Sequence, residues 1–154
     1  MRQLLLTKTS ARQGKNCVDD KIVVDVSAAL KTLLQDNAVH CDKAIALLMD
    51  YQLIQAPHFI AEVAAVLARK KTIEADQDLA DFLEVEMTLA DDPTIYQQAI
   101  RLSIDLNHHL FDMLYHAVAL ETNGALLITA DNVYYEKAKH LGRIKLLADF
   151  KQKV

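Results

Sequence analysis

The segment Ile22-Val-Val-Asp-Val-Ser-Ala-Ala-Leu-Lys31 contains a strand, a polar stop and the beginning of a helix within ten residues. Three β-branched residues in succession predict a short buried strand over residues 21–25, which Asp25 ends. Residues 27–35 then suit a helix that carries leucines on one face. A buried strand that leads into a helix is typical of proteins in which helices cover a parallel sheet.

The rest of the chain continues this alternation of strands and helices. Strands separated by helices imply parallel pairing with right-handed crossovers. The predicted fold is therefore an α/β fold, a three-layer α/β/α sandwich with a small, mainly parallel sheet, formed by residues 21–154 after an N-terminal arm of residues 1–20. Further strands are predicted at 53–56, 125–129 and 144–147, and helices at 44–51 (capped by Asp42), 59–71, 76–89, 93–106 (capped by Asp92), 110–122 and 133–141.

Composition excludes several classes of protein. At 154 residues the chain suits one domain, which buries about two thirds of its unfolded surface. Three glycines leave no room for a glycine-rich nucleotide loop. No apolar run approaches the roughly 20 residues that cross a bilayer, and Cys17 and Cys41 lack zinc-type spacing. We therefore expect a cytoplasmic protein with reduced cysteines and no membrane association.

Four carboxylates interrupt or end apolar stretches, where an acid is costly. A carboxylate buried without a partner costs roughly several kcal/mol and is protonated instead. A divalent cation that all four share removes this penalty. Oxygen ligands without supporting His or Cys indicate Mg²⁺ or Mn²⁺ rather than zinc. The four acids are Asp25 after Ile22-Val-Val24, Glu62 within Phe59-Ile-Ala-Glu-Val-Ala-Ala-Val-Leu-Ala68, Asp112 between Leu110 and Leu120, and Asp131 after Leu126-Leu-Ile-Thr-Ala130.

The predicted topology brings these acids toward one rim, because ligands gather at the carboxyl ends of parallel strands. Each acid also has a purely structural interpretation, since Asp25 and Asp131 precede helices and suit N-caps. Glu62 is the hardest to explain structurally, because no Lys or Arg lies three or four residues away and His58 is mostly neutral at pH 7.

The histidines and bases favour structural interpretations when each is taken alone. His116 lies four residues after Asp112, yet a helix-packing or surface position is favoured, and His108-His109 suits a solvent position. Residues 1–16 carry four bases and no acid, so the rest of the chain holds 13 bases against 21 acids. Such an acidic body binds phosphate poorly unless cations or basic patches offset its charge.

The residues resemble those of PIN-domain ribonucleases, particularly the VapC-type toxins of toxin–antitoxin pairs. The segments that carry the resemblance are Ile22-Val-Val-Asp-Val-Ser-Ala-Ala-Leu-Lys31, Ala56-Pro-His-Phe-Ile-Ala-Glu-Val-Ala64, Phe111-Asp-Met-Leu-Tyr115 and Leu127-Ile-Thr-Ala-Asp131, in the order typical of the family. The chain departs at Thr32, where the family often has tryptophan, at Phe111, where tyrosine is common, and at Met113, where alanine is usual. The first 20 residues have no clear counterpart.

The resemblance implies a metal-dependent endoribonuclease, the toxin of a toxin–antitoxin pair. Asp25, Glu62, Asp112 and Asp131 would hold one or two Mg²⁺ or Mn²⁺ ions, with Ser27 and Thr129 orienting the carboxylates. Basic residues near Lys31, Lys137 and Arg143 would steer the RNA backbone. The implied partners are RNA, a cognate antitoxin and a second copy of the chain, for which an apolar helix such as residues 44–51 offers a face.

Other functions stay open at this point. A non-catalytic PIN-like module would bind RNA or a protein and leave RNA intact. An aspartyl-phosphate phosphatase built on Asp25 is disfavoured, because that chemistry needs a second acid two positions on, where Ser27 stands.

Overall fold

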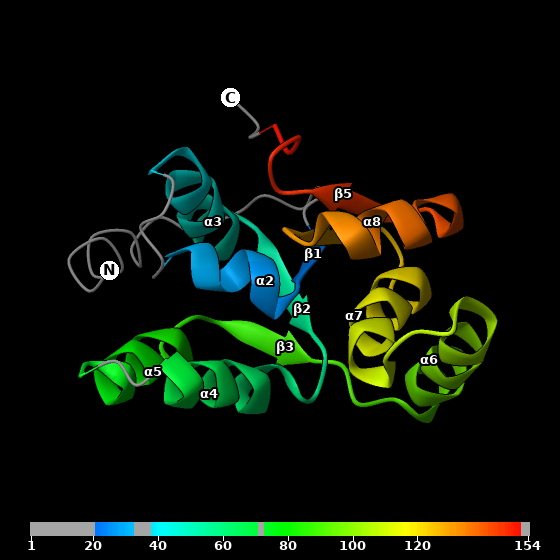
Figure 1. Cartoon of the computed structure of the whole chain (residues 1–154), viewed down its shortest axis with the longest axis horizontal. Helices are drawn as coiled ribbons and strands as arrows, with labels where there is room; N and C mark the ends of the chain where they lie inside the picture. The colour runs from blue at the N-terminus through cyan, green and yellow to red at the C-terminus, as the bar shows by residue number, and fades with distance from the viewer. Residues whose placement is uncertain (1–20, 33–37, 71–72, 152–154) are drawn as a thin grey trace.

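A five-stranded, all-parallel sheet forms the centre of the fold in the computed structural model, which describes residues 21–32, 38–70 and 73–151 (Figure 1). The predicted N-terminal arm, residues 1–20, lies outside the described residues. The strand order is β3-β2-β1-β4-β5. The strands are β1 (Lys21–Val24), β2 (Gln52–Gln55), β3 (Met87–Leu89), β4 (Leu126–Thr129) and β5 (Ile144–Leu146).

The strand β1 occupies the centre of the sheet because its apolar run has no polar face. Ile22, Val23 and Val24 are all buried, as expected of a parallel strand that is covered on both sides. Ile22 pairs with Leu53 of β2 on one side and with Leu126 of β4 on the other. Asp25 follows directly, at the carboxyl edge of the sheet.

Helices flank the sheet, as the α/β/α prediction requires (Figure 1). The helix α7 packs across β1, β2 and β4, and α8 packs against β5. No helix in the described part of the chain is long and apolar enough to cross a membrane. The helices are α2 (Val26–Ala29), α3 (Ala38–Asp50), α4 (Phe59–Lys70), α5 (Ala75–Leu83), α6 (Pro93–Leu106), α7 (Leu110–Glu121) and α8 (Asn132–Ala138), with 3₁₀ turns η1 (Leu30–Thr32) and η2 (Lys139–Leu141).

The predicted cap of the helix over residues 93–106 is present. Asp92 accepts a hydrogen bond from the backbone N–H of Thr94 at the start of α6, and Pro93 is the first residue of that helix. Gly142 ends η2 with a φ of +76°, a conformation that glycine adopts without strain.

The prediction of a helix over residues 76–89 was wrong in its second half. The helix α5 ends at Leu83, and Met87–Leu89 forms the edge strand β3, in which Leu53 of β2 pairs with Met87. The strand is three residues long, and Thr88 and Leu89 are exposed. A short, exposed edge strand has no alternating apolar pattern, so it is indistinguishable from the end of an amphipathic helix in sequence.

The helix predicted at residues 44–51 begins six residues earlier than expected, at Ala38. Asp42 therefore lies inside α3 and is not its cap. The apolar face of this helix, with Ala44, Leu47 and Leu48, is buried in the core of the same chain. That face is consequently not free to contact a second copy, which corrects the surface suggested for dimerisation.

Candidate functional site

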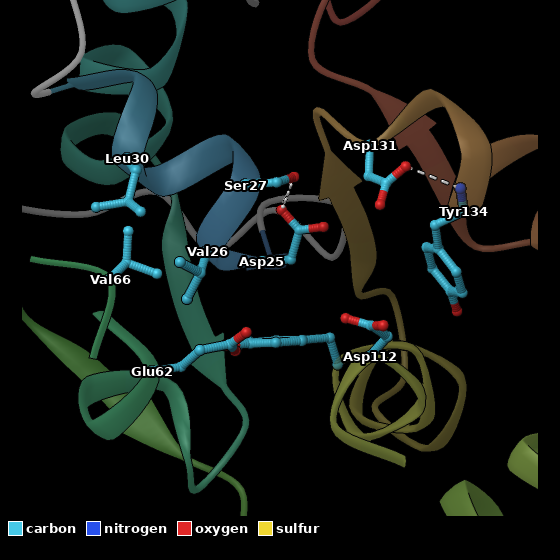
Figure 2. Close-up of a pocket in the computed structure, with 10 residues that line it drawn as sticks. Asp25, Val26, Ser27, Leu30, Glu62, Val66, Asp112, Asp131 and Tyr134 are labelled. Atoms are coloured by element: carbon cyan, nitrogen blue, oxygen red, sulfur yellow. Dashed lines mark hydrogen bonds between the residues drawn. The ribbon is translucent and has the colours of Figure 1, made fainter. Parts of the chain in front are cut away.

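All four carboxylates singled out in the sequence line one pocket of about 230 Å³ (Figure 2). They reach it from four separate segments: Asp25 follows β1, Glu62 is on α4, Asp112 is on α7, and Asp131 follows β4. The pocket is lined by Asp25, Val26, Ser27, Leu30, Glu62, Val66, Asp112, Tyr115, Asp131 and Tyr134.

Asp25 and Asp131 meet because β1 and β4 are neighbouring parallel strands with a common carboxyl edge. The backbone N–H of Asp25 donates to the carbonyl of Ile128 at 3.2 Å, which continues the pairing to the rim. Both acids are also N-caps: one oxygen of Asp25 accepts from the N–H of Ala28, and one of Asp131 from the N–H of Tyr134, each at 2.9 Å. Asp25 and Asp131 therefore each cap a helix and line the pocket at the same time.

Glu62 and Asp112 enter from the first turns of α4 and α7, where the helix dipole favours negative charge. Glu62 Oε2 accepts a hydrogen bond of 2.7 Å from the hydroxyl of Tyr115. Asp112 Oδ2 lies 2.9 Å from Nε2 of His108. Each carboxylate is thus held at one oxygen by a neighbouring side chain.

The pocket contains more negative charge than its surroundings neutralise. Burial raises the pKa of Asp25 to about 6, although hydrogen bonds from Ser27, Thr129 and Ala28 oppose this, and the charge of Asp112 adds to it. Burial also raises the pKa of Asp112, with further contributions from the charges of Glu62 and Asp131. An acid whose ionised form is disfavoured in this way binds either a proton or a cation.

Glu62 differs from the other two, because its pKa is lowered, chiefly by the ring of His58. Nε2 of His58 lies 3.4 Å from Glu62 Oε2, a contact that does not reach hydrogen-bond geometry, since both ring nitrogens of His58 are without a hydrogen-bond partner. The hydroxyl of Tyr115 lowers the pKa further, while burial acts in the opposite direction. Glu62 is therefore the carboxylate with the most internal support.

Ser27 and Thr129 tie the two strand ends together. The hydroxyl of Ser27 donates to Asp25 at 2.6 Å and accepts from the N–H of Ala130 at 2.9 Å. It also lies 3.3 Å from the hydroxyl of Thr129, which accepts from the N–H of Asp131 at 3.0 Å. Ser27 thus contacts Asp25 directly, and Thr129, which lies beside Ser27 and also lowers the pKa of Asp25, accepts a hydrogen bond from the backbone of Asp131.

Sequence reasoning assigned no role to Tyr115 and misjudged His108. Tyr115 is 1% exposed, and burial and the charge of Glu62 raise its pKa, so its hydroxyl keeps its proton and donates to Glu62. His108 was predicted at a solvent position but contacts Asp112. For His108 the spacing carried a signal, because it lies four residues before Asp112. Tyr115 and Glu62 are 53 residues apart, so no spacing predicts their contact.

His116, in contrast, takes one of the two positions predicted for it, the one in helix packing. Its ring is fully buried and lies 2.8 Å from the hydroxyl of Tyr134 at Nδ1 and 2.8 Å from the carbonyl of Gly142 at Nε2. Burial lowers its pKa, so the ring is neutral at pH 7. The carbonyl accepts only from an N–H, which assigns the proton to Nε2.

The three basic residues named in the sequence do not line the pocket. Lys137 donates to the carbonyl of Asn107 at 2.9 Å, and Arg143 donates to the carbonyl of Ala125 at 3.3 Å. Both therefore hold loop backbone in place. Lys31 follows the pocket residue Leu30 in η1.

The donor set of the pocket fits a hard divalent cation, because it consists of four carboxylates with no cysteine or histidine among the lining residues. The raised pKa of Asp25 points the same way. As the side chains of the described residues lie, however, no group of three or more His, Cys, Asp or Glu is arranged so that it could hold an ion. Binding would therefore require the carboxylates to turn toward one another.

Comparison with known proteins gives a family and a fold. Residues 22–140 match the model of the PIN domain. No curated protein matches the chain. Among solved structures, VapBC-1 from nontypeable Haemophilus influenzae has a TM-score of 0.63 at 15% identity, covering 84% of this chain and 99% of that one.

Two further structures share this fold. PAE2754 from Pyrobaculum aerophilum has a TM-score of 0.60 at 22% identity, covering 83% of this chain and 90% of that one. VapBC2 from Rickettsia felis, bound to a DNA fragment from its promoter, has a TM-score of 0.59 at 14% identity, with 82% and 96% covered.

Proposed function

This chain belongs to the PIN domain family, and from this membership and the acidic pocket we propose that it is a metal-dependent endoribonuclease that hydrolyses RNA phosphodiester bonds. The observation that carries the proposal is the meeting of four carboxylates from distant segments in one pocket at the carboxyl edge of the sheet. A structural role explains the capping acids Asp25 and Asp131 singly. It does not explain why Glu62 and Asp112 face the same space.

Asp25, Glu62, Asp112 and Asp131 would hold one or two Mg²⁺ or Mn²⁺ ions. A bound ion supplies a Lewis acid that lowers the pKa of water and offsets phosphate charge. The protein contributes position: Tyr115 orients Glu62, Ser27 orients Asp25, and His108 orients Asp112. With the cation bound, the acidic body no longer opposes the approach of a phosphate.

We further propose that the protein is the toxin of a toxin–antitoxin pair and acts in the cytoplasm. The resemblance of its motifs to VapC-type toxins supports this, and so does the similarity of its fold to two VapBC structures. The partner would then be a cognate antitoxin. A homodimer is also proposed, with the exposed residues Tyr96, Ile100 and Ile104 of α6 as the apolar surface in place of α3.

The second candidate is a PIN-domain module that binds RNA or protein without cutting it. One observation favours it: as they lie, no three acidic, His or Cys side chains in the described part of the chain are arranged to hold an ion. The two candidates differ in metal-dependent cleavage, because a pure binder leaves RNA intact.

The decisive experiment incubates the protein with a mixed pool of single-stranded RNA in Mn²⁺, in Mg²⁺ and in EDTA. Wild type should cut RNA with either metal and not in EDTA, and Asp112→Asn should cut at least about 100-fold more slowly. Asp105→Asn is the matched control, because Asp105 is exposed on α6 and outside the pocket. Intact RNA in every condition, with RNA binding retained, would establish the non-catalytic module instead.

A further inference from the structure

Three aromatic rings form a column beside the acidic pocket, defined here as Tyr115, His58 and Phe111. The ring centroids of Tyr115 and His58 are 4.6 Å apart, and those of His58 and Phe111 are 5.2 Å apart with the planes 36° from parallel. At its inner end, the Tyr115 hydroxyl is hydrogen-bonded to the pocket carboxylate Glu62. At its outer end, Phe111 is 59% exposed. The column therefore connects the pocket to the surface.

The exposure of Phe111 has no explanation in the fold. It lies in the first turn of α7, whose residues from Met113 to Ala119 are buried. An isolated exposed apolar residue is ordinary. Phe111 does not line the pocket, but it directly precedes Asp112, and its ring packs on His58, whose Nε2 lies 3.4 Å from the pocket carboxylate Glu62.

The middle ring, His58, packs by its faces against the other two rings, and its Nε2 lies 3.4 Å from the pocket carboxylate Glu62. Both ring nitrogens of His58 are buried without a hydrogen-bond partner, and in the described part of the chain only Nε2 of Gln55 shares that condition. Leaving such groups unpaired is costly. The ring is nevertheless held between Tyr115 and Phe111, where it fixes the position of the exposed ring.

The exposed ring of Phe111 suits contact with a nucleobase better than contact with a phosphate. A bound cation would offset the charge of the phosphate at the pocket, but it makes no contact with the bases of the RNA. The two predicted basic residues Lys137 and Arg143 donate to backbone carbonyls instead of lining the pocket. Stacking on an aromatic ring needs no charge and accepts any base with a free face. Unpaired bases of single-stranded RNA have such faces, whereas bases in a duplex do not.

We propose that Phe111 is a stacking platform for an unpaired nucleobase next to the phosphate at the acidic pocket. This subsite rests on the proposed action on RNA and adds to it a contact with one base, made by Phe111. It also assigns a function to Phe111 that is separate from the four carboxylates.

The test uses short single-stranded oligoribonucleotides that carry 2-aminopurine at one position each, because stacking on an aromatic ring quenches its fluorescence. Binding is measured with Mn²⁺ in the Asp112→Asn background, so that the RNA stays intact. We expect quenching at one or two neighbouring positions of the scan. Phe111→Leu should abolish this quenching and raise Kd roughly 5- to 10-fold, which is the low end of the range for a base stacked on an aromatic ring. Phe111→Trp should keep both the quenching and the wild-type Kd.

Leu83→Ala is the matched control, because it removes an apolar side chain that is as exposed as Phe111, at 59%, from α5 outside the pocket. It should change neither quenching nor Kd. Thermal melting verifies that Phe111→Leu is folded, as expected for a residue so exposed.

The outcomes separate this subsite from the nuclease itself. If wild type cuts RNA while Phe111→Leu binds with unchanged Kd and quenching, the stacking platform is wrong and the nuclease stands. If quenching depends on Phe111 but wild type cuts no RNA, the platform stands and the nuclease is wrong. Absence of quenching at every position overturns the platform and leaves Phe111 as a contact for a protein partner.

Discussion

Asp25 illustrates how a single residue of the pocket combines a structural role with an unfavourable charge. Its capping oxygen is held by Ser27 and Ala28, which keeps the side chain in place at the end of β1. Burial nevertheless raises its pKa from 3.8 to about 6. The folded protein without cation therefore has a destabilising charge at neutral pH, and this charge is the one that a divalent ion would relieve.

The first prediction follows from that pKa. Because the folded-state pKa lies above the unfolded one, the folded protein binds the proton more tightly, and stability falls as pH rises from about 4 to about 6.5. The shift corresponds to about 3 kcal/mol at neutral pH. Asp25→Asn keeps the cap but removes the charge, so in EDTA it should be more stable than wild type at pH 7 and nearly equal to it at pH 4.

Urea unfolding in EDTA across this pH range measures the difference. With Mn²⁺ present, Asp25→Asn should be the weaker protein in function: its affinity for the cation and its rate of RNA cleavage should both be lower than those of wild type. If the difference in stability between Asp25→Asn and wild type does not change with pH, ionisation of Asp25 does not destabilise the folded protein, and the prediction is wrong.

The second prediction concerns Tyr115. Tyr115→Phe keeps the buried ring but removes the hydroxyl that donates to Glu62, so Mn²⁺ affinity should fall about 10-fold, the usual effect of losing a partner that orients a ligand. Tyr134→Phe is the control, because the Tyr134 hydroxyl contacts His116 and no pocket carboxylate. Isothermal titration with Mn²⁺ compares them, and equal losses in both variants would mean that the Glu62 contact has no special role.

At the scale of elements, the site depends on joining the ends of β1 and β4. The two strands pair in parallel from Ile22 to Val24, and Ser27 continues the connection beyond the last paired residues by contacting Asp25 and the N–H of Ala130. Only Asp25 lies between the end of β1 and the start of α2, and its side chain caps that helix. The cap fixes the first turn of α2, which carries Ser27. The cap, the bridge and the pocket are consequently one local structure.

The third prediction tests this bridge. Ser27→Ala leaves the N–H of Ala130 without its acceptor, so stability should fall by about 1–2 kcal/mol and Mn²⁺ affinity should also fall. Thr94→Ala is the control, since the Thr94 hydroxyl donates to the carboxylate of Asp92 at the start of α6, outside the pocket. It should lose stability in chemical denaturation but keep its Mn²⁺ affinity. If Ser27→Ala binds Mn²⁺ as wild type does, the bridge is structural alone.

At the scale of the whole molecule, the negative charge affects both the stability of the fold and its affinity for a cation. The chain has a net charge of −4, and four of its acids meet at one pocket. Their mutual repulsion opposes folding, whereas a cation that binds only the folded state favours it. Metal binding should therefore be visible in the unfolding of the entire protein, independently of any cleavage.

The fourth prediction is a rise in melting temperature with Mn²⁺. At 100 times the Kd, the gain is about 2.7 kcal/mol, or roughly 5–10 °C for a domain of this size. The rise should be smaller at pH 5 than at pH 7, because the proton on Asp25 competes with the cation. An NaCl control at equal ionic strength excludes screening, and a melting temperature unaffected by millimolar Mn²⁺ would contradict the metal site.

Much of this architecture is readable from the chain because it depends on local pattern. Ile22 to Val24 and Leu126 to Ile128 are continuous apolar runs, which in an alternating chain have room only in a parallel sheet covered on both sides. Parallel strands share a carboxyl edge, so residues that directly follow them meet. Asp25 and Asp131 could be placed together for this reason alone.

The edge strand β3 and the contacts around Glu62 were decided only by the tertiary structure. Met87–Leu89 becomes a strand because β2 presents an open edge to it, and no pattern in three residues records that edge. Tyr115 and Glu62 are separated by 53 residues, and their hydrogen bond depends on how α4 and α7 are rotated against the sheet. That rotation is set by core packing over the whole molecule, which is why the carboxylates were identifiable in the sequence and the aromatic column beside them was not.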